Sequence, residues 1–249
     1  MARLEIEPPL VEEALFLAIR DGRLTAPGDG DEFHRERERV YGRPPADRER
    51  AFRALARRWF ERLHLDRPLR LALDVCPRAA RDLGRVAVRR CRSARREGSE
   101  LFRSEDAEPL FVLGVRAERF CDRPGLYAFA LRELLYAEDM LDPAFGHRPA
   151  LPPGLEPARR ELVRDRYRVL WEARVAGRMA RAGVAHGPPD GAPPRFRRAF
   201  GRAADPAAVD ALYGEAFGGG LATQAALLEP ALSGVTAPGP PTSAIGSPG

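Results

Sequence analysis

The residues with the clearest potential for chemistry lie on one expected helix, in the stretch "LYAFALRELLYAEDMLDPAFG" from Leu126 to Gly146. Glu133 follows Arg132 directly, and Tyr136 comes four residues after Arg132. Residues spaced i, i+4 share one face of a helix, so the guanidinium and the phenol are expected side by side with the carboxylate next to them. A carboxylate in such surroundings could act as a general base.

The same spacing holds a metal ion in many zinc peptidases, in which an H-E-x-x-H helix supplies two histidines and a glutamate base. Here the segment "RELLY" keeps only Glu133 of that pattern. The stretch from about Phe52 to Ala182 nevertheless resembles small bacterial zincin-like proteins of the gluzincin type. Their corresponding segment reads H-E-L-x-H and leads into a turn like "DMLDPAFG". The resemblance implies a zincin-like core and places Glu133 at the position of the general base.

The resemblance also implies a third metal ligand, an acid on the following helix. Asp165 and Glu161 are the candidates, with Glu172 behind them on the same helical face. Asp139 and His147 would be outer groups around this site.

Arg132 and Tyr136 stand where the two histidine ligands would be. A guanidinium has no lone pair to donate to a metal, and a phenolate is a rare zinc ligand. We therefore expect no catalytic zinc and no other metal or cofactor. One hypothesis is that Arg132 replaces the cation and neutralises Asp165 or Glu161, with Tyr136 donating to the same carboxylate. The alternative is that Arg132 pairs with its neighbours at the surface while Tyr136 packs in the core.

Two other sites use the same region. His147, Cys121 and Glu133 could together form a different metal site, although a single loop histidine is usually solvated. Glu133, Tyr136 and His147 could alternatively form an unorthodox hydrolase site. Glu138 and Asp139 could support either site or simply be helix-end acids.

The composition is strongly biased. All 41 basic residues are arginine, the chain has no lysine or asparagine, and the net charge is +5. This bias is typical of a GC-rich bacterial genome. The arginines alternate with acids, as in "HRERERV", which is typical of solvated helix faces and makes nucleic acid the less favoured partner. Three widely spaced cysteines favour a reducing cytoplasm, and no apolar run of about 18 residues predicts a membrane span.

Apolar periodicity predicts a mostly helical α+β fold with a small central antiparallel sheet. The expected strands lie in "GRVAVRRC", "REGSELF" and "PLFVLGVRA". The expected helices cover residues 10–21, 47–65, 66–76, 124–141, 156–182, 206–217 and 222–232.

The predicted division of the chain has four parts: an N-terminal helical segment and loop (1–45), a zincin-like core (46–186), a linker with a small helical appendage (187–232), and a disordered tail (233–249). The function expected from this reading is that of a degenerate, inactive metallopeptidase relative. It would act as a binding or scaffold protein that holds a protein or peptide in the former substrate cleft. An active hydrolase and an arginine-rich nucleic-acid-associated protein are the alternatives.

Overall fold

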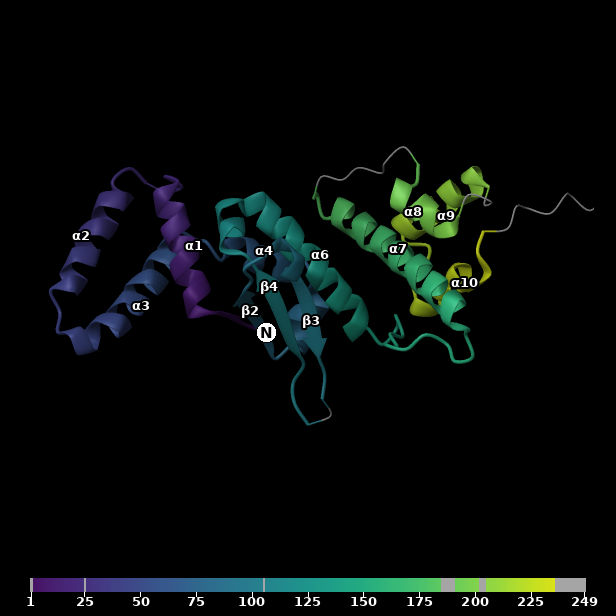
Figure 1. The fold of residues 1–249 in the computed structure, drawn as a ribbon, viewed down its shortest axis with the longest axis horizontal. Coiled ribbons are helices and arrows are strands. Elements are labelled where there is room, and N and C mark those ends of the chain that lie inside the picture. The colour runs from purple at the N-terminus through teal and green to yellow at the C-terminus, as the bar shows by residue number, and fades with distance from the viewer. Residues whose placement is uncertain (1, 25, 105, 185–190, 202–204, 236–249) are drawn as a thin grey trace, which may run out of the picture. The chain divides into compact units, whose positions relative to one another are not determined.

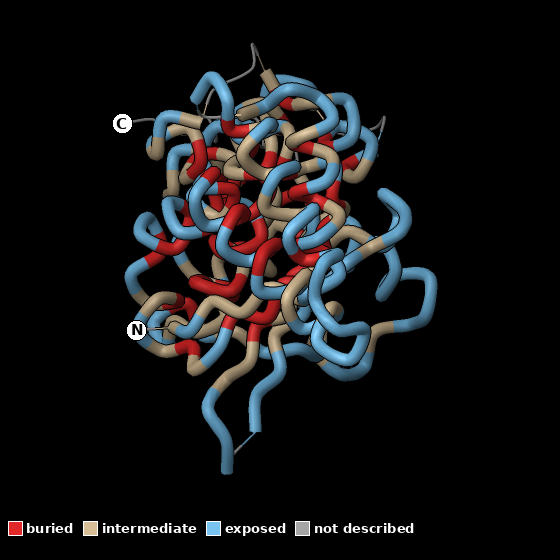
Figure 2. The backbone as a smooth tube through the Cα atoms, turned by 90° about the vertical axis from the view of Figure 1, so that its left-hand side faces the viewer, coloured by how far each residue is buried: buried red, intermediate tan, exposed pale blue. Residues whose placement is uncertain are grey.

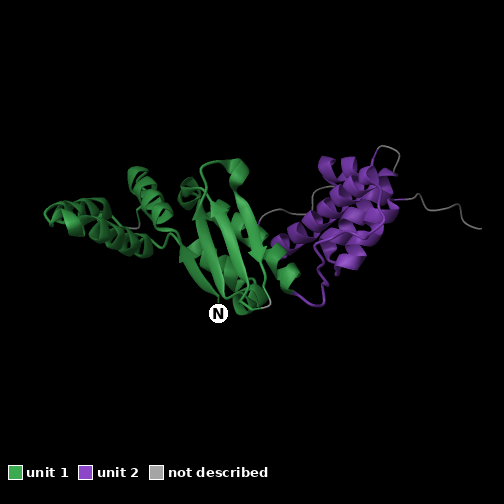
Figure 3. Cartoon of the chain, turned by 60° about the horizontal axis from the view of Figure 1, so that its bottom comes forward, with its two compact units in different colours: residues 1–141 green, residues 142–249 purple. Residues whose placement is uncertain are grey.

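The computed structural model describes residues 2–24, 26–104, 106–184, 191–201 and 205–235 (Figure 1). It confirms the α+β class: helices dominate, and there is one small sheet. The chain forms two compact units, Met1–Leu141 and Asp142–Gly249 (Figure 3). Of the expected tail, residues 236–249 lie outside the described residues, as does most of the expected linker.

Among the described residues, the first unit contains the four strands and six α-helices. The strands are β1 (Arg3–Ile6), β2 (Arg85–Arg90), β3 (Gly98–Phe102) and β4 (Leu110–Val115). The helices are α1 (Pro8–Arg20), α2 (Asp29–Tyr41), α3 (Pro45–Arg62), α4 (Arg67–Asp74), α5 (Pro77–Asp82) and α6 (Arg123–Leu141), with short 3-10 turns η1 (Ala94–Arg96) and η2 (Ala117–Cys121).

The sheet is mixed, with strand order β1-β2-β4-β3. β1, β2 and β4 are parallel neighbours, and only β3 runs antiparallel to β4. The predicted antiparallel sheet is therefore wrong for β2 and β4. Because β3 returns from β2 through η1 without pairing with it, β4 can enter between the two strands.

One face of the sheet is packed by helix α6. Phe111, Leu113 and Val115 alternate along β4 and are buried, and their neighbours Val86 and Val88 on β2 are buried too. Helix α6 contacts β3 and β4, and α4 and α5 pack against α6. Ten of the 19 residues of α6 are buried. Figure 2 shows the buried residues of the described chain in red.

The second unit is helical among its described residues. It consists of α7 (Pro157–Arg181), α8 (Pro194–Phe200), α9 (Pro206–Gly218) and α10 (Gln224–Ser233). α8, α9 and α10 all pack against α7. The close approach of α7 and α9 requires Gly177, since a Cβ at that position would overlap the carbonyl oxygen of Phe217.

The unit boundary differs from the predicted division. The expected zincin-like core, residues 46–186, extends across the boundary at Leu141, and α7 belongs to the second unit with the expected appendage. The reason is apolar packing: Val163, Val169, Leu170 and Ala173 of α7 are buried in a cluster with residues of α8, α9 and α10.

The predicted helices are present, and four elements were not predicted: β1, α2, α5 and α8. α2 was missed because its sequence, "DGDEFHRERERVY", buries only Asp29 and Val40. Side-chain contacts with α3 hold it instead, including the hydrogen bond from the Trp59 indole to Glu36 (2.6 Å).

Candidate functional site

Helix α6 presents Glu133 to the edge strand β3. The Glu133 side chain lies under β3 with the residue only 8% exposed. Ser99 is the register partner of Leu113, so its side chain faces α6, and its hydroxyl donates to Glu133 Oε2 at 2.8 Å. Arg132 donates to the other carboxylate oxygen, Oε1, through Nε at 3.0 Å and Nη2 at 2.7 Å. Both oxygens of Glu133 are therefore occupied by donors.

A second ion pair lies on the same side of the sheet. Glu97, which directly precedes β3, accepts two hydrogen bonds from Arg119, at 2.7 and 2.9 Å. Its carboxylate also accepts from the backbone N–H of Arg116 at 3.1 Å. The Glu97 side chain is 4% exposed, so this pair is largely withdrawn from water.

Phe129 links the two ion pairs. The guanidinium carbon of Arg119 lies 4.4 Å from the centre of the Phe129 ring, and that of Arg132 lies 5.5 Å from it. Both distances fall within the range of a cation–π contact. Ser99, Glu133, Arg132, Phe129, Arg119 and Glu97 thus form one connected group, which we call the α6–β3 cluster.

The electrostatics of the cluster favour its charged form. Burial opposes ionisation of Glu97, but the hydrogen bonds from Arg119 and from the Arg116 amide outweigh it, and the pKa of Glu97 lies below its ordinary value. The hydrogen bond to Glu97 likewise raises the pKa of Arg119, against the effect of burial. Both shifts favour the ionised pair.

The predicted pairing of Arg132 is corrected by these contacts. The guanidinium pairs with Glu133, its own neighbour, and the acids expected on the following helix belong to the second unit. Asp165 is paired with Arg168, and Glu161 with Arg164 at 2.6 Å, each on an exposed face of α7. An arginine three residues away on the same helix reaches these acids without any long-range contact.

The remaining predicted residues are distributed over both units. Tyr136 is partly buried on α6, and Asp139 is buried near the end of that helix. In the second unit, Glu172 pairs with Arg195 at 3.0 Å, and the His147 ring lies 5.6 Å from the ring of Trp171. The grouping of His147 with Glu133, Tyr136 or Cys121 therefore joins residues of two different units.

Glu138 has a structural role. Its two carboxylate oxygens accept from the backbone N–H groups of Arg78 (3.1 Å) and Ala79 (2.7 Å). These groups lie at the N-terminus of α5, where the first N–H groups of a helix lack partners within the helix. Glu138 therefore holds α5 against α6 and is not an accessory to Glu133.

Sequence reasoning missed Ser99, Glu97 and Arg119. The available signal was weak: "REGSE" showed a turn followed by a strand, and "RAERF" showed one more mixed-charge stretch. Their proximity to Glu133 depends on β3 occupying the sheet edge beside β4, which no local pattern indicates.

The residues at the expected ligand positions do not fit a zinc ion. Arg132 has no lone pair, and it already occupies one oxygen of Glu133. In the described ranges, no group of three or more His, Cys, Asp or Glu side chains is arranged to hold a metal. Within the same ranges, no helix has the length and apolarity needed to cross a membrane.

Comparison of the chain with protein-family models, with curated proteins and with solved structures found no match.

Proposed function

We propose that this protein is a degenerate relative of zincin metallopeptidases that lacks catalytic zinc and acts by binding. The observation that carries the proposal is the Arg132–Glu133 pair. In the active pattern, the glutamate at this position must be available to a metal-bound water. Here the Arg132 guanidinium and the Ser99 hydroxyl hold both of its oxygens, and Glu133 acts as a structural anion.

The proposed ligand is an extended segment of a protein or peptide bound along β3. This strand lies at the end of the sheet, beside β4 alone among the described strands. An edge strand offers unpaired N–H and C=O groups to which an extended chain can add. The cluster rigidifies β3 from behind, because Ser99 and Glu97 tie its N-terminal end to α6 and η2.

Side chains near this edge would give selectivity. Phe102 is half exposed at the end of β3 and offers an apolar contact. The Arg132 side chain is also half exposed, so its guanidinium can accept a second anionic partner while it holds Glu133. A ligand that combines an apolar residue with a carboxylate fits these two groups best. We place this binding function in the bacterial cytoplasm.

Metal analysis of the purified full chain tests the proposal. After incubation with zinc sulfate and gel filtration, we expect well under one zinc per chain by mass spectrometry and no cleavage of fluorescent casein. In the double variant Arg132→His/Tyr136→His, which restores the H-E-x-x-H spacing, we expect zinc retention to rise, since two imidazoles and a freed Glu133 then face one point.

Stoichiometric zinc in the unaltered chain would overturn the proposal. Casein cleavage that is abolished by Glu133→Gln would instead establish the hydrolase alternative. A double variant that folds normally but retains no more zinc than the unaltered chain would count against the relationship to zincins, because the helix would then lack the expected geometry.

A further inference from the structure

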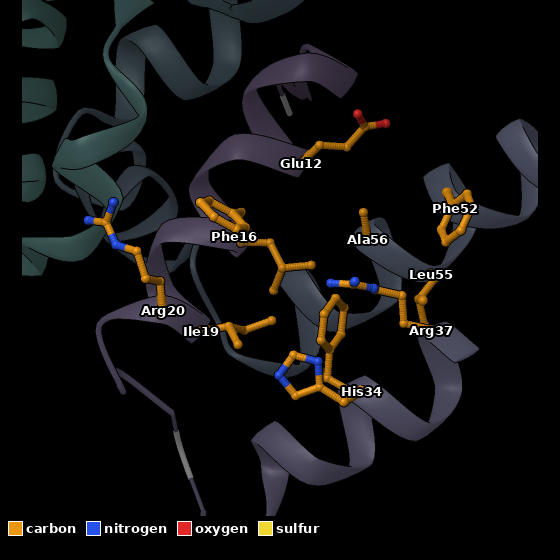
Figure 4. Close-up of a pocket in the computed structure, with 11 residues that line it drawn as sticks. Glu12, Phe16, Ile19, Arg20, His34, Arg37, Phe52, Leu55 and Ala56 are labelled. Atoms are coloured by element: carbon orange, nitrogen blue, oxygen red, sulfur yellow. The ribbon is translucent and has the colours of Figure 1, made fainter. Parts of the chain in front are cut away.

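An apolar groove lies in the N-terminal part of the first unit, among helices α1, α2 and α3 (Figure 4). Its volume is about 510 Å³, which is in the range of small-molecule sites. α1 and α2 each pack on α3, and the groove opens where the two helices diverge. Its walls are mostly aliphatic and aromatic: Leu15, Phe16, Ile19, Phe33, Phe52 and Leu55.

One arginine of the groove, Arg37, has a nitrogen without a hydrogen-bond partner among the described residues. The Arg37 side chain extends from α2 across the groove toward α1, whereas the head group of Arg20 points away from it (Figure 4). Arg37 Nε is fully buried and has no hydrogen-bond partner in the part of the chain that the structure describes. A buried N–H of a charged group without an acceptor is costly, and a ligand carboxylate that pairs with the rest of the same guanidinium would offset that cost.

Neighbouring arginines differ from Arg37 because they pair with carboxylates. Arg58 pairs with Glu36 at 2.7 Å, and Arg62 pairs with Asp29 and Glu32, both at 2.8 Å. The acids of α2 that face α3 are therefore already neutralised. The nearest aromatic contact of Arg37, with the Tyr41 ring at 5.8 Å, supplies no hydrogen-bond acceptor.

We propose that the groove binds a free amphipathic carboxylate, with its aliphatic or aromatic chain between α1 and α3 and its carboxylate on Arg37. Three features specify this class of ligand. The apolar walls exclude a strongly polar metabolite. Glu12 and Arg20 also line the groove, but Arg37 is the lining arginine whose head group extends across it, which favours a ligand with one anionic group. The guanidinium matches the two oxygens of a carboxylate. The site is independent of the α6–β3 cluster and of the function proposed for it.

Calorimetric titration of the full chain tests the inference, with dodecanoate as the probe and dodecanol as its neutral counterpart, both below their aggregation limits. We expect dodecanoate to bind about tenfold more tightly than dodecanol, the effect of one charge-assisted contact. In Arg37→Gln that preference should disappear, while dodecanol binding is unchanged.

Two further variants give the site its controls. Arg35→Gln removes an exposed arginine from the same helix that does not line the groove, and it should leave both affinities unchanged. Phe16→Ala removes an apolar wall that is 60% exposed and tolerant of substitution. It should weaken both ligands severalfold, and circular dichroism of each variant confirms that it is folded.

The inference is overturned if dodecanoate does not bind, if it binds no better than dodecanol, or if Arg35→Gln lowers its affinity as much as Arg37→Gln does. It is also overturned if the unaltered chain is a dimer that Phe16→Ala converts to a monomer, since a second copy would then be the occupant of the groove.

Discussion

The two longest helices, α6 and α7, treat their acidic residues in opposite ways. α6 buries Glu133, Glu138 and Asp139. α7 leaves Glu161 and Asp165 in water, where each is paired with an arginine of its own helix. The two helices also differ in composition, since α6 is mostly apolar and α7 is rich in charged residues. The comparison shows that an acid acquires an architectural role when another element lies opposite it, as β3 does for Glu133 and α5 does for Glu138.

The buried residues of α7, a helix described over its whole length, include a glycine, Gly177, and no acid. Gly177 lets the backbone of α7 approach α9 at Phe217. The first unit is thus held together partly by buried carboxylates, and the second by its apolar cluster and the close backbone approach at Gly177. Five substitutions, with their controls, test this contrast, from the largest expected effect to the smallest.

Gly177→Ala should destabilise the second unit by about 3 kcal/mol, because the new methyl group meets a backbone oxygen that cannot rotate away. Thermal unfolding followed by circular dichroism measures the loss. Gly214→Ala on α9 is the matched control, since a Cβ there has no atom within 4 Å. It should stabilise the unit by about 0.5–1 kcal/mol through helix propensity. Equal effects at the two glycines would contradict the packing argument.

Glu97→Gln should cost about 2 kcal/mol in the free energy of unfolding, because it leaves Arg119 without its carboxylate partner. Urea unfolding at pH 7 gives the value. Glu100→Gln, on the exposed face of β3, should change it little.

The difference in the free energy of unfolding between the unaltered chain and Glu97→Gln should also depend on pH. The pKa of Glu97 is lowered by folding from an ordinary value of 4.5. Its contribution is therefore complete above pH 4.5 and is lost as the pH falls through the lower, folded-state pKa. A difference that grows on acidification would have the wrong sign and would contradict the assigned ion pair.

Glu138→Gln should cost about 1 kcal/mol, because the amide retains only one acceptor for the two N–H groups at the start of α5. Urea unfolding measures the cost, and hydrogen exchange at Ala79 should accelerate in the variant. Glu118→Gln, an exposed acid on η2, serves as the control. Unchanged exchange at Ala79 would show that Glu138 does not cap this helix.

Asp165→Asn and Glu161→Gln should each change the free energy of unfolding by less than about 0.5 kcal/mol, since exposed pairs within a helix contribute little. Both can be measured in the urea series used for Glu97. A loss above about 2 kcal/mol at Asp165 would revive its expected pairing with a buried cation.

Local periodicity was sufficient for most of the helices. The apolar stripe that predicted α3 consists of Phe52, Leu55, Ala56, Trp59, Phe60 and Leu63, and all of these except Phe52 are buried. It failed for α2, where charge pairs with α3 replace an apolar face. It also failed for β1, whose four residues, "RLEI", are too few to show a pattern.

The α6–β3 cluster was harder to predict because it depends on which charged and polar side chains pair with one another. The sequence singled out Glu133 as a former general base, and the structure places its partners on β3 and at its own neighbour, Arg132. With 36 acidic and 41 basic residues in the chain, sequence alone cannot rank the possible pairs. Only the order of the strands, which results from long-range pairing, brings Ser99 and Glu97 to α6.

The pairing of β1 with β2 has a consequence for the ribosome-bound chain. Arg3 lies opposite Arg85, and Ile6 lies opposite Val88. During synthesis the first strand leaves the exit tunnel with its partner still unmade, so it must wait for residues 85–88, whereas α1, α2 and α3 can form as soon as they emerge. β1 is therefore synthesised before β2 but can pair only after β2 has emerged. Until β1 pairs, the edge of β2 that receives it is exposed.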